Sequence, residues 1–269
     1  MSLERVKKFY NEGVAYEWNR LERHPVEFEI TIRHLAEFTN KRQVIADIGG
    51  GPGRYSFYFA DKGHNVTLVD LSNENIDFAK NKSNELGIAL ENYHTLSATN
   101  LNELESSKFD IVLCFGPMYH LEDTGDLNKV LEECRRILKK NGILAIVFLT
   151  PWSHAFSAIN YAPERMTELK PFYFDLIDSQ KNTTNLDIEF PNGWNPKPEN
   201  IRGYMENHYF STEKLVSLEG PFGQHFESIH TELSKKTYQD WMDYMYKLST
   251  EKSLLGSCAH LLYIGSKLH

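Results

Sequence analysis

The sequence predicts an α/β protein in which a doubly wound, mostly parallel sheet is covered by helices on both faces. Short apolar runs alternate with helix-like stretches from residue 44 to residue 149, which is typical of parallel strands joined by crossover helices. A glycine-rich stretch follows the first apolar run, where such sheets place a ligand-binding turn. Beyond residue 150 the alternation stops, which indicates a segment inserted into this architecture.

The first strand is expected over residues 44–48, which are short, apolar and rich in β-branched side chains. A helix rich in aromatic residues should follow over 54–62 and end near Gly63. The second strand is expected over 66–70, where a second apolar run ends on Asp70. These three elements would form one β-α-β unit.

The next helix has both of its ends marked in the sequence. Ser72 is a typical N-cap and Gly87 a typical C-cap, so the helix should cover residues 73–86. A short third strand is expected over 93–96.

The remaining part of the alternating region contains two strands and one helix. Residues 109–115 read as a fourth strand, and 126–140 repeat apolar residues with a helical period and a basic last turn. Asn141 and Gly142 should turn the chain into a fifth strand at 143–149.

The segment 151–210 is rich in both aromatic residues and prolines. Its aromatic content argues against a disordered linker, and its prolines argue against one long helix. We expect a cap over the carboxyl edge of the sheet. After it, the sequence predicts a helix over 211–218, a strand over 226–231, a helix over 238–248 and a last strand over 260–264.

Composition narrows the class of protein. The formal net charge is −8, and no block of Lys and Arg is dense enough to follow a phosphate backbone, which disfavours nucleic acid as a partner and favours a small molecule. No apolar run suits a secretory signal or a membrane span. Three separated cysteines without Cys-x-x-Cys spacing predict a reduced, cytoplasmic protein without a bound metal. The oligomeric state is left open.

The glycine-rich turn indicates a cofactor that contains adenosine. Gly49, Gly51 and Gly53 allow a ligand to approach the backbone closely, and Asp70 follows Gly53 by seventeen positions, where a carboxylate can accept hydrogen bonds from a ribose. Nicotinamide and flavin proteins use G-x-G-x-x-G, whose third glycine is replaced here by Arg54. No Gly-Lys-Ser or Gly-Lys-Thr follows, which argues against a P-loop.

The order Asp47-x-Gly49-x-Gly51-x-Gly53 resembles the first motif of the class I S-adenosylmethionine-dependent methyltransferases of the small-molecule type. Asp70, at the end of the second strand, is similar to the acidic residue of that family. The cofactor that this resemblance implies is S-adenosylmethionine.

Two further segments strengthen the resemblance. Residues 109–115 and 118–121 are similar to the family's fourth strand and following loop, and 138–142 resembles its Leu-Lys-Pro-Gly-Gly turn, with Lys140 and Asn141 as departures.

The resemblance implies a Rossmann-like sheet of seven strands in the order 3-2-1-4-5-7-6, with strand 7 antiparallel. Residues 260–266 would then lie between the strands at 143–149 and 226–231. The expected organisation is an N-terminal helical lid (1–40), a cofactor-binding core (41–150), an inserted substrate cap (151–210) and the C-terminal part of the core sheet (211–269).

Roles for the cofactor-binding residues follow from the same resemblance. Asp47 would order the glycine turn or meet the cofactor's ammonium group through water, and Asp70 would bind the ribose. Ser97 can hydrogen-bond the adenine amino group, while Leu71 and Phe115 can sandwich the ring. Alternatively, Asp70 caps the following helix and Phe115 is an ordinary core residue.

Tyr16 lies in a helical stretch that resembles the lid of many small-molecule methyltransferases, where a tyrosine face suits a sulfonium charge. The alternative is an amphipathic helix fixed to the sheet edge. The complete set expected to bind the cofactor is Tyr16, Asp47, Gly49, Gly51, Gly53, Asp70, Leu71, Ser97, Ala98, Thr99 and Phe115.

The acceptor site is less well defined by the sequence. His120, one turn after the fourth strand, is the candidate general base, although a buried structural histidine is the alternative. Met118, Tyr119, His154 and Tyr204 are the candidate acceptor-binding residues. The loop lacks the Asn-Pro-Pro-Tyr pattern typical of base and glutamine methyltransferases, which favours a small apolar or aromatic acceptor in a capped pocket.

The sequence therefore predicts an enzyme that transfers a methyl group by in-line displacement to an oxygen, nitrogen or carbon of a small molecule. A non-catalytic domain that binds the same cofactor is one alternative. A nicotinamide-dependent oxidoreductase is another, which Arg54 disfavours.

Overall fold

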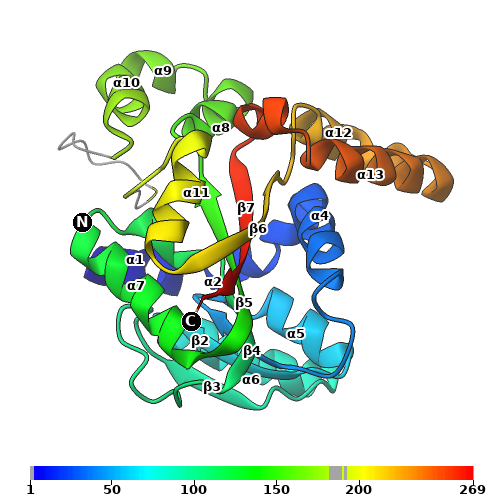
Figure 1. Cartoon of the computed structure of the whole chain (residues 1–269). Coiled ribbons are helices and arrows are strands. Elements are labelled where there is room, and N and C mark those ends of the chain that lie inside the picture. The colour runs from blue at the N-terminus through cyan, green and yellow to red at the C-terminus, as the bar shows by residue number, and fades with distance from the viewer. Residues whose placement is uncertain (1–2, 182–189, 191–192, 269) are drawn as a thin grey trace.

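The computed structural model of the chain describes residues 3–181, 190 and 193–268. These residues form a seven-stranded sheet in the order β3-β2-β1-β4-β5-β7-β6, which confirms the predicted order (Figure 1). The strands β1 to β5 run parallel, whereas β7 is antiparallel to both β5 and β6. The strands are β1 (Val44–Ile48), β2 (Asn65–Asp70), β3 (Asn92–Thr95), β4 (Phe109–Cys114), β5 (Leu138–Leu149), β6 (Phe210–Ser217) and β7 (His260–Lys267).

The helices that connect the first strands begin and end close to where the sequence places them. They are α5 (Arg54–Asp61), α6 (Asn73–Leu86) and α7 (Thr124–Ile137). The Ser72 hydroxyl accepts a hydrogen bond from the Asn75 N–H at 3.0 Å, and Gly87 adopts a left-handed conformation with φ of +68°. Both predicted caps of α6 are therefore confirmed.

The strand β5 begins earlier than predicted. The helix expected to reach residue 140 ends at Ile137, and Leu138 already pairs with Phe109 of β4. The register between these strands shifts after Phe109, and Asn141 has a φ of +59°. Asn141 and Gly142 therefore bend β5 rather than separate it from α7.

Two predictions for the C-terminal part are wrong. Of residues 211–218, expected as a helix, 211–217 lie in β6, which pairs with β7. Residues 226–231, expected as a strand, lie in α12 (Gly223–Ile229) and the short 3-10 helix η2 (His230–Glu232). Consequently β7 lies between β5 and β6, and not beside 226–231.

The helix predicted over 238–248 is confirmed as α13 (Lys235–Ser249), and a short 3-10 helix, η3 (Lys252–Ser257), precedes β7. In place of a strand, Phe226 of α12 packs its ring 5.5 Å from that of Tyr238 on α13.

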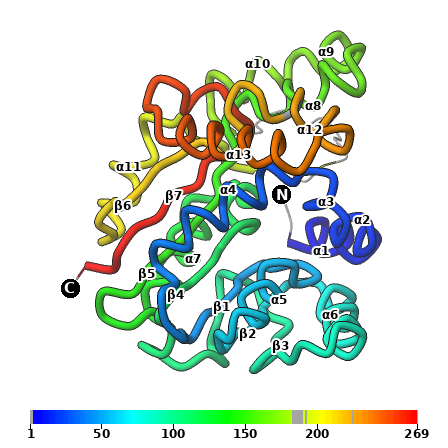
Figure 2. Tube along the Cα trace, turned by 90° about the vertical axis from the view of Figure 1, so that its right-hand side faces the viewer, coloured from blue at the N-terminus to red at the C-terminus, as the bar shows by residue number. Residues whose placement is uncertain are grey.

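Four helices precede β1, and they lie beside the rest of the core as Figure 2 shows. The first three, α1 to α3, are short and follow one another closely in the sequence. Of these, α1 and α2 contact α6. The fourth, α4, packs against α13. Their bounds are α1 (Leu3–Glu12), α2 (Val14–Trp18), α3 (Arg20–Arg23) and α4 (Pro25–Ala36).

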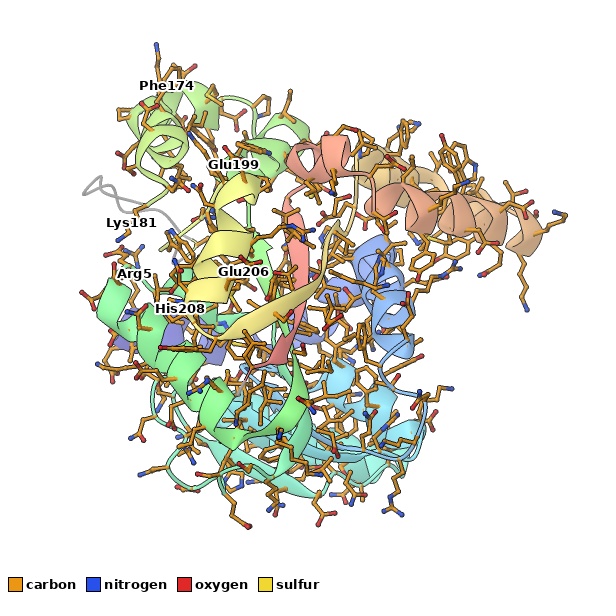
Figure 3. All side chains as sticks on the ribbon, in the orientation of Figure 1. Arg5, Phe174, Lys181, Glu199, Glu206 and His208 are labelled. Atoms are coloured by element: carbon orange, nitrogen blue, oxygen red, sulfur yellow. The ribbon has the colours of Figure 1, made fainter. Side chains whose placement is uncertain are left out.

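Between β5 and β6 the described residues form α8 (Ser153–Tyr161), α9 (Arg165–Glu168), α10 (Lys170–Ser179) and α11 (Pro198–Asn207). Figure 1 shows α8, α9 and α10 beyond the end of the sheet and α11 in front of it. Ile201 and Met205 of α11 are buried in the core. Just after α11, His208 hydrogen-bonds Asn128 of α7 at 2.9 Å (Figure 3).

The sheet has an apolar core on each face. One face packs against α7 and α11, and the other against α4, α5, α6 and α13. Among the residues that the structure describes, no helix combines the length and apolar character that a membrane crossing needs.

Candidate active site

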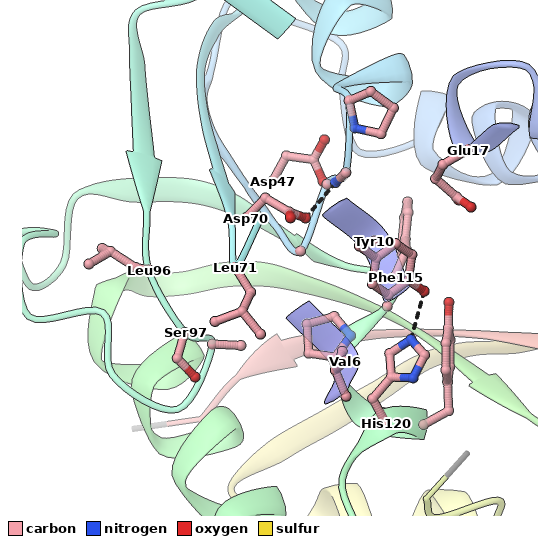
Figure 4. Close-up of a pocket in the computed structure, with 18 of the residues that line it drawn as sticks. Val6, Tyr10, Glu17, Asp47, Asp70, Leu71, Leu96, Ser97, Phe115 and His120 are labelled. Atoms are coloured by element: carbon pink, nitrogen blue, oxygen red, sulfur yellow. Dashed lines mark hydrogen bonds between the residues drawn. The ribbon is translucent and has the colours of Figure 1, made fainter. Parts of the chain in front are cut away.

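A pocket opens where the parallel strands end, with N-terminal residues along one side (Figure 4). It holds about 990 Å³ of space not filled by atoms, a volume that includes its open mouth. Its N-terminal wall consists of Leu3, Val6, Tyr10, Glu17, Arg20 and Leu21. The other walls consist of Asp47, Gly49–Pro52, Arg54, Tyr55, Asp70, Leu71, Leu96–Thr99, Phe115–Pro117 and Tyr119–Leu121.

The glycine turn after β1 needs glycine for both backbone and space. Gly49 has a φ of +67°, and a Cβ on it would lie 2.7 Å from the ring of Pro117. Gly53 has a φ of +92° and begins α5, where its neighbours are Leu68 and Phe57. Gly53 thus shapes the turn from behind and does not line the pocket.

Asp70 holds the turn in place from the end of β2. Its carboxylate accepts hydrogen bonds from the N–H of Gly51 and of Ser72, both at 2.8 Å, and from the Asn75 side chain at 3.1 Å. Burial raises the pKa of Asp70 in spite of these three donors. A carboxylate offers about four acceptor positions, so one remains for a ribose hydroxyl.

Asp47 is a second buried acid at the same site, with 1% of its surface exposed. Burial raises its pKa to about 6, and the nearby charge of Asp70 adds to this effect, although the Ser56 hydroxyl donates to Asp47 at 2.7 Å. Burial disfavours the ionised form of both Asp47 and Asp70, so a positively charged ligand would stabilise the two carboxylates.

The N-terminal wall contributes an acid and a base that the sequence did not single out. The Glu17 Cγ lies 3.7 Å from where a Cβ on Gly51 would be, so this side chain covers the turn. Arg20 donates from Nε to Glu17 at 3.0 Å and from its two Nη atoms to both oxygens of Glu27, at 2.6 and 2.7 Å. Its other two N–H groups make no hydrogen bond to a residue that the structure describes, and they suit a ligand carboxylate.

A buried ion-pair network supports Arg20 from behind. Burial alone would raise the pKa of Glu27, but the charges of Arg20 and His260 lower it to about 2. Burial alone would likewise lower the pKa of His260, but the charges of Glu219 and Glu27 raise it to about 9. The network joins α3 and α4 to the start of β7.

His120 and Tyr10 meet in the part of the pocket that lies away from Leu96 and Ser97 (Figure 4). His120 belongs to the 3-10 helix η1 (Pro117–His120), is 4% exposed, and its Nε2 lies 2.7 Å from the Tyr10 hydroxyl, as the dashed line in Figure 4 shows. Burial raises the pKa of Tyr10 well above its usual range, so the phenol keeps its proton at neutral pH. Tyr119 lines the pocket beside them.

The structure brings most of the predicted cofactor residues into one pocket. These are Asp47, Gly49, Gly51, Asp70, Leu71, Ser97, Ala98, Thr99 and Phe115. Tyr16 does not join them: it is 67% exposed, and the Arg23 guanidinium lies over its ring at 3.9 Å. Tyr10 of α1 is the tyrosine of this segment that lines the pocket, whereas Tyr16 lies in α2, beyond Gly13.

Three of the candidate acceptor residues lie outside the pocket lining. Met118 is fully buried in the core. His154 packs against Phe172 and Phe190, with ring centroids 5.3 and 5.6 Å away. Tyr204 packs 4.6 Å from Trp194 and donates to Asn128 at 3.3 Å. Tyr119 and His120 therefore remain as the predicted acceptor-side residues that line the pocket.

The pocket residues fit S-adenosylmethionine. Leu71 and Phe115 provide apolar walls beside Ser97, whose hydroxyl is 2.8 Å from that of Thr99, for an adenine ring. Asp70 has acceptor capacity for a ribose, and Glu17 and Arg20 offer a negative and a positive group to the two charges of an amino acid.

This fold and this pocket define an α/β protein that binds an adenosine-containing cofactor at the carboxyl ends of its strands. Residues 46–146 match the methyltransferase domain family. The chain is 37% identical over 107 residues to a ubiquinone biosynthesis O-methyltransferase of Paraburkholderia phymatum, covering 40% of this chain and 44% of that protein. It is 31% identical over 120 residues to a tRNA 5-carboxymethoxyuridine methyltransferase of Escherichia coli, covering 43% and 44%. The matched segment thus spans less than half of either relative.

Among solved structures, the fold is similar to a Burkholderia thailandensis 1,6-didemethyltoxoflavin-N1-methyltransferase with bound 1,6-didemethyltoxoflavin and S-adenosylhomocysteine. The TM-score is 0.60 with 12% identity, over 99% of this chain and 88% of that one. Residues 46–146 thus match a methyltransferase domain, and the fold of the described chain is similar to that of an S-adenosylmethionine-dependent methyltransferase.

Proposed function

We propose that this protein transfers the methyl group of S-adenosylmethionine to a small-molecule acceptor. The observation that carries the proposal is one pocket that joins the glycine turn and Asp70 to an aromatic end with a Tyr10–His120 hydrogen bond. The cofactor would supply an electrophilic methyl carbon on a positively charged sulfur.

In this proposal the chain's own residues align the reactants and exclude water. Asp70 holds the ribose, Asp47 and Glu17 favour the positive charges, and Arg20 binds the carboxylate. The acceptor's lone pair forms the new bond to the methyl carbon while the pair of the broken C–S bond stays on sulfur. If the acceptor atom carries a proton, the Tyr10–His120 pair lies where it can take up that proton.

The proposed acceptor is small and not a nucleic acid, although one relative acts on tRNA. The net charge of −8 and the carboxylates of the pocket support this choice. In the same proposal α1 to α3 form a lid, and α8 to α10 form a cap near the acceptor end. We also propose a cytoplasmic location, which is supported by the three buried cysteines, all of them free thiols.

Isothermal titration with S-adenosylmethionine and S-adenosylhomocysteine tests the cofactor part. We expect both to bind, and we expect Asp70→Ala to lose most of the affinity while Asp77→Ala, an exposed acid on α6, keeps it. Undiminished binding by Asp70→Ala would refute the assigned site. Turnover with a panel of small acceptors separates an enzyme from a domain that only binds the cofactor.

A further inference from the structure

The charged groups that line the pocket do not balance. Three carboxylates, those of Glu17, Asp47 and Asp70, face the same space as two guanidiniums, those of Arg20 and Arg54. Glu17 covers the glycine turn from the N-terminal side, and Figure 4 shows it on the side of Tyr10, with Asp47 and Asp70 across the pocket.

The two guanidiniums are further neutralised from behind. Arg20 is bonded to both oxygens of Glu27, and Arg54 to Glu22 at 3.1 Å. The next pair outward, Glu219 with His260, cancels itself. Five carboxylates therefore surround two guanidiniums, and the pocket with its supporting groups has three uncompensated negative charges.

The cofactor accounts for only part of this excess. S-adenosylmethionine has a sulfonium, an ammonium and a carboxylate, so it brings one net positive charge. Two negative charges of the pocket and its supporting groups then remain uncompensated. In a pocket of low dielectric, such an excess acts more strongly on a second ligand than it would at the surface.

The uncharged walls favour the same kind of ligand. The rings of Tyr10, Tyr55, Phe115 and Tyr119 line the pocket, and aromatic faces attract cations. Burial raises the pKa of each tyrosine among them, so the phenols add no charge of their own at neutral pH.

We propose that the acceptor is a small molecule with a positively charged amino group, and that the pocket rejects carboxylates, phosphates and nucleic acid. This inference rests on the proposed function and adds the charge class of its substrate. It concerns how the acceptor is bound, and it leaves open whether the nitrogen or another atom receives the methyl group.

Binding of three probes of similar shape tests the charge preference in the presence of saturating S-adenosylhomocysteine. The probes are 2-phenylethylamine, 2-phenylethanol and phenylacetate, which are cationic, neutral and anionic at pH 7.5. By calorimetry or ligand-detected NMR we expect the amine to bind on the order of tenfold or more tighter than the acid, with the alcohol between them. Equal or tighter binding of phenylacetate, or an amine no better than the alcohol, would overturn the proposal.

Variants locate the origin of the preference. Glu17→Gln removes one pocket charge while its amide oxygen can still accept from Arg20 Nε, so the amine-to-acid ratio should fall several-fold. Glu12→Gln is the matched control, because Glu12 is an exposed acid on α1 that does not line the pocket and pairs with Lys8 at 3.9 Å, and it should leave the ratio unchanged. An unchanged ratio in Glu17→Gln would overturn the role of the pocket carboxylates.

Two further measurements separate this inference from the proposed function. Failure of the wild-type protein to bind S-adenosylhomocysteine would refute the methyltransferase site itself, whatever the probes do. Transfer of a labelled methyl group to total tRNA would overturn the charge preference while it supported methyl transfer.

Discussion

Replacing Asp47 by asparagine should make the protein more stable and its cofactor site weaker. Asp47 is 1% exposed, and its pKa in the folded state is about 6, above its ordinary value of 3.8. The raised pKa means that the folded protein binds a proton more readily than the unfolded chain does. The contribution of Asp47 to stability is therefore greatest below pH 3.8, and it is lost as the pH rises through 6.

The size of the effect follows from this shift. A difference of about two pKa units corresponds to about 3 kcal/mol at pH 7. Asparagine removes the charge and keeps the shape, and the Ser56 hydroxyl can either donate to the new amide or accept from it. We expect Asp47→Asn to gain roughly 1–3 kcal/mol at pH 7 and almost nothing at pH 4.

Urea denaturation at pH 7.5 and pH 4 measures this gain, and calorimetry measures the accompanying loss of affinity for S-adenosylmethionine, which we expect to be about tenfold or more. Asp61→Asn is the control: Asp61 is exposed at the end of α5, so its effect should stay within about 0.5 kcal/mol. A loss of stability at pH 7.5, or an equal gain at both pH values, would refute the reasoning.

Three further predictions concern the turn and the network behind it. Gly49→Ala should lower the free energy of unfolding by about 2 kcal/mol or more and abolish cofactor binding, because its Cβ would lie 2.7 Å from Pro117. Gly63 is the control, since it has a φ of +87° but open space around it. Gly63→Ala should cost about 1 kcal/mol of stability and leave cofactor binding, measured by calorimetry, intact. Equal loss of binding in both would contradict this. Arg20→Met should lower the free energy of unfolding, measured in urea, by about 3–5 kcal/mol, because it leaves the Glu27 carboxylate buried without its guanidinium. Adding Glu27→Gln to the same chain should recover part of this loss. A cost of Arg20→Met below about 1 kcal/mol would argue against the network. His260 has a pKa raised from 6.5 to about 9, so its contribution is complete below pH 6.5 and is lost as the pH rises through 9. Wild-type stability should fall by up to about 3 kcal/mol over this window, and a similar fall in His260→Gln would assign it to another group.

The first half of the fold was predictable because its signals are local. The β-branched runs and the caps at Ser72 and Gly87 act within a few residues, and the structure confirms them. The strand β6 has no comparable local signal: it becomes a strand by pairing along its length with β7, which is distant in the sequence. Conversely, residues 226–231 have no strand partner among the described residues and lie in α12 and η2, with the Phe226 ring buried beside α13.

The candidate site divides in the same way. The glycine turn and Asp70 are fixed by short spacings, so the motif locates that half of the pocket. Glu17 and Arg20 reach it only because α1 to α3 cross the end of the sheet, and no spacing in the sequence encodes that path. Tyr10 and Tyr16 lie in the same predicted helical stretch, and the sequence pattern does not distinguish Tyr10, which lines the pocket, from Tyr16, which is exposed.

The place of β7 between β5 and β6 has a consequence for the order in which the chain can fold during synthesis. The ribosome delivers β6 before β7, yet among the described residues β7 is the strand with which β6 pairs. Until β7 emerges, β6 has no sheet edge to join, because it does not pair with β5. The last two strands are therefore expected to join the sheet in a single late step. Until that step, the apolar residues of β6 remain open to contacts with other chains.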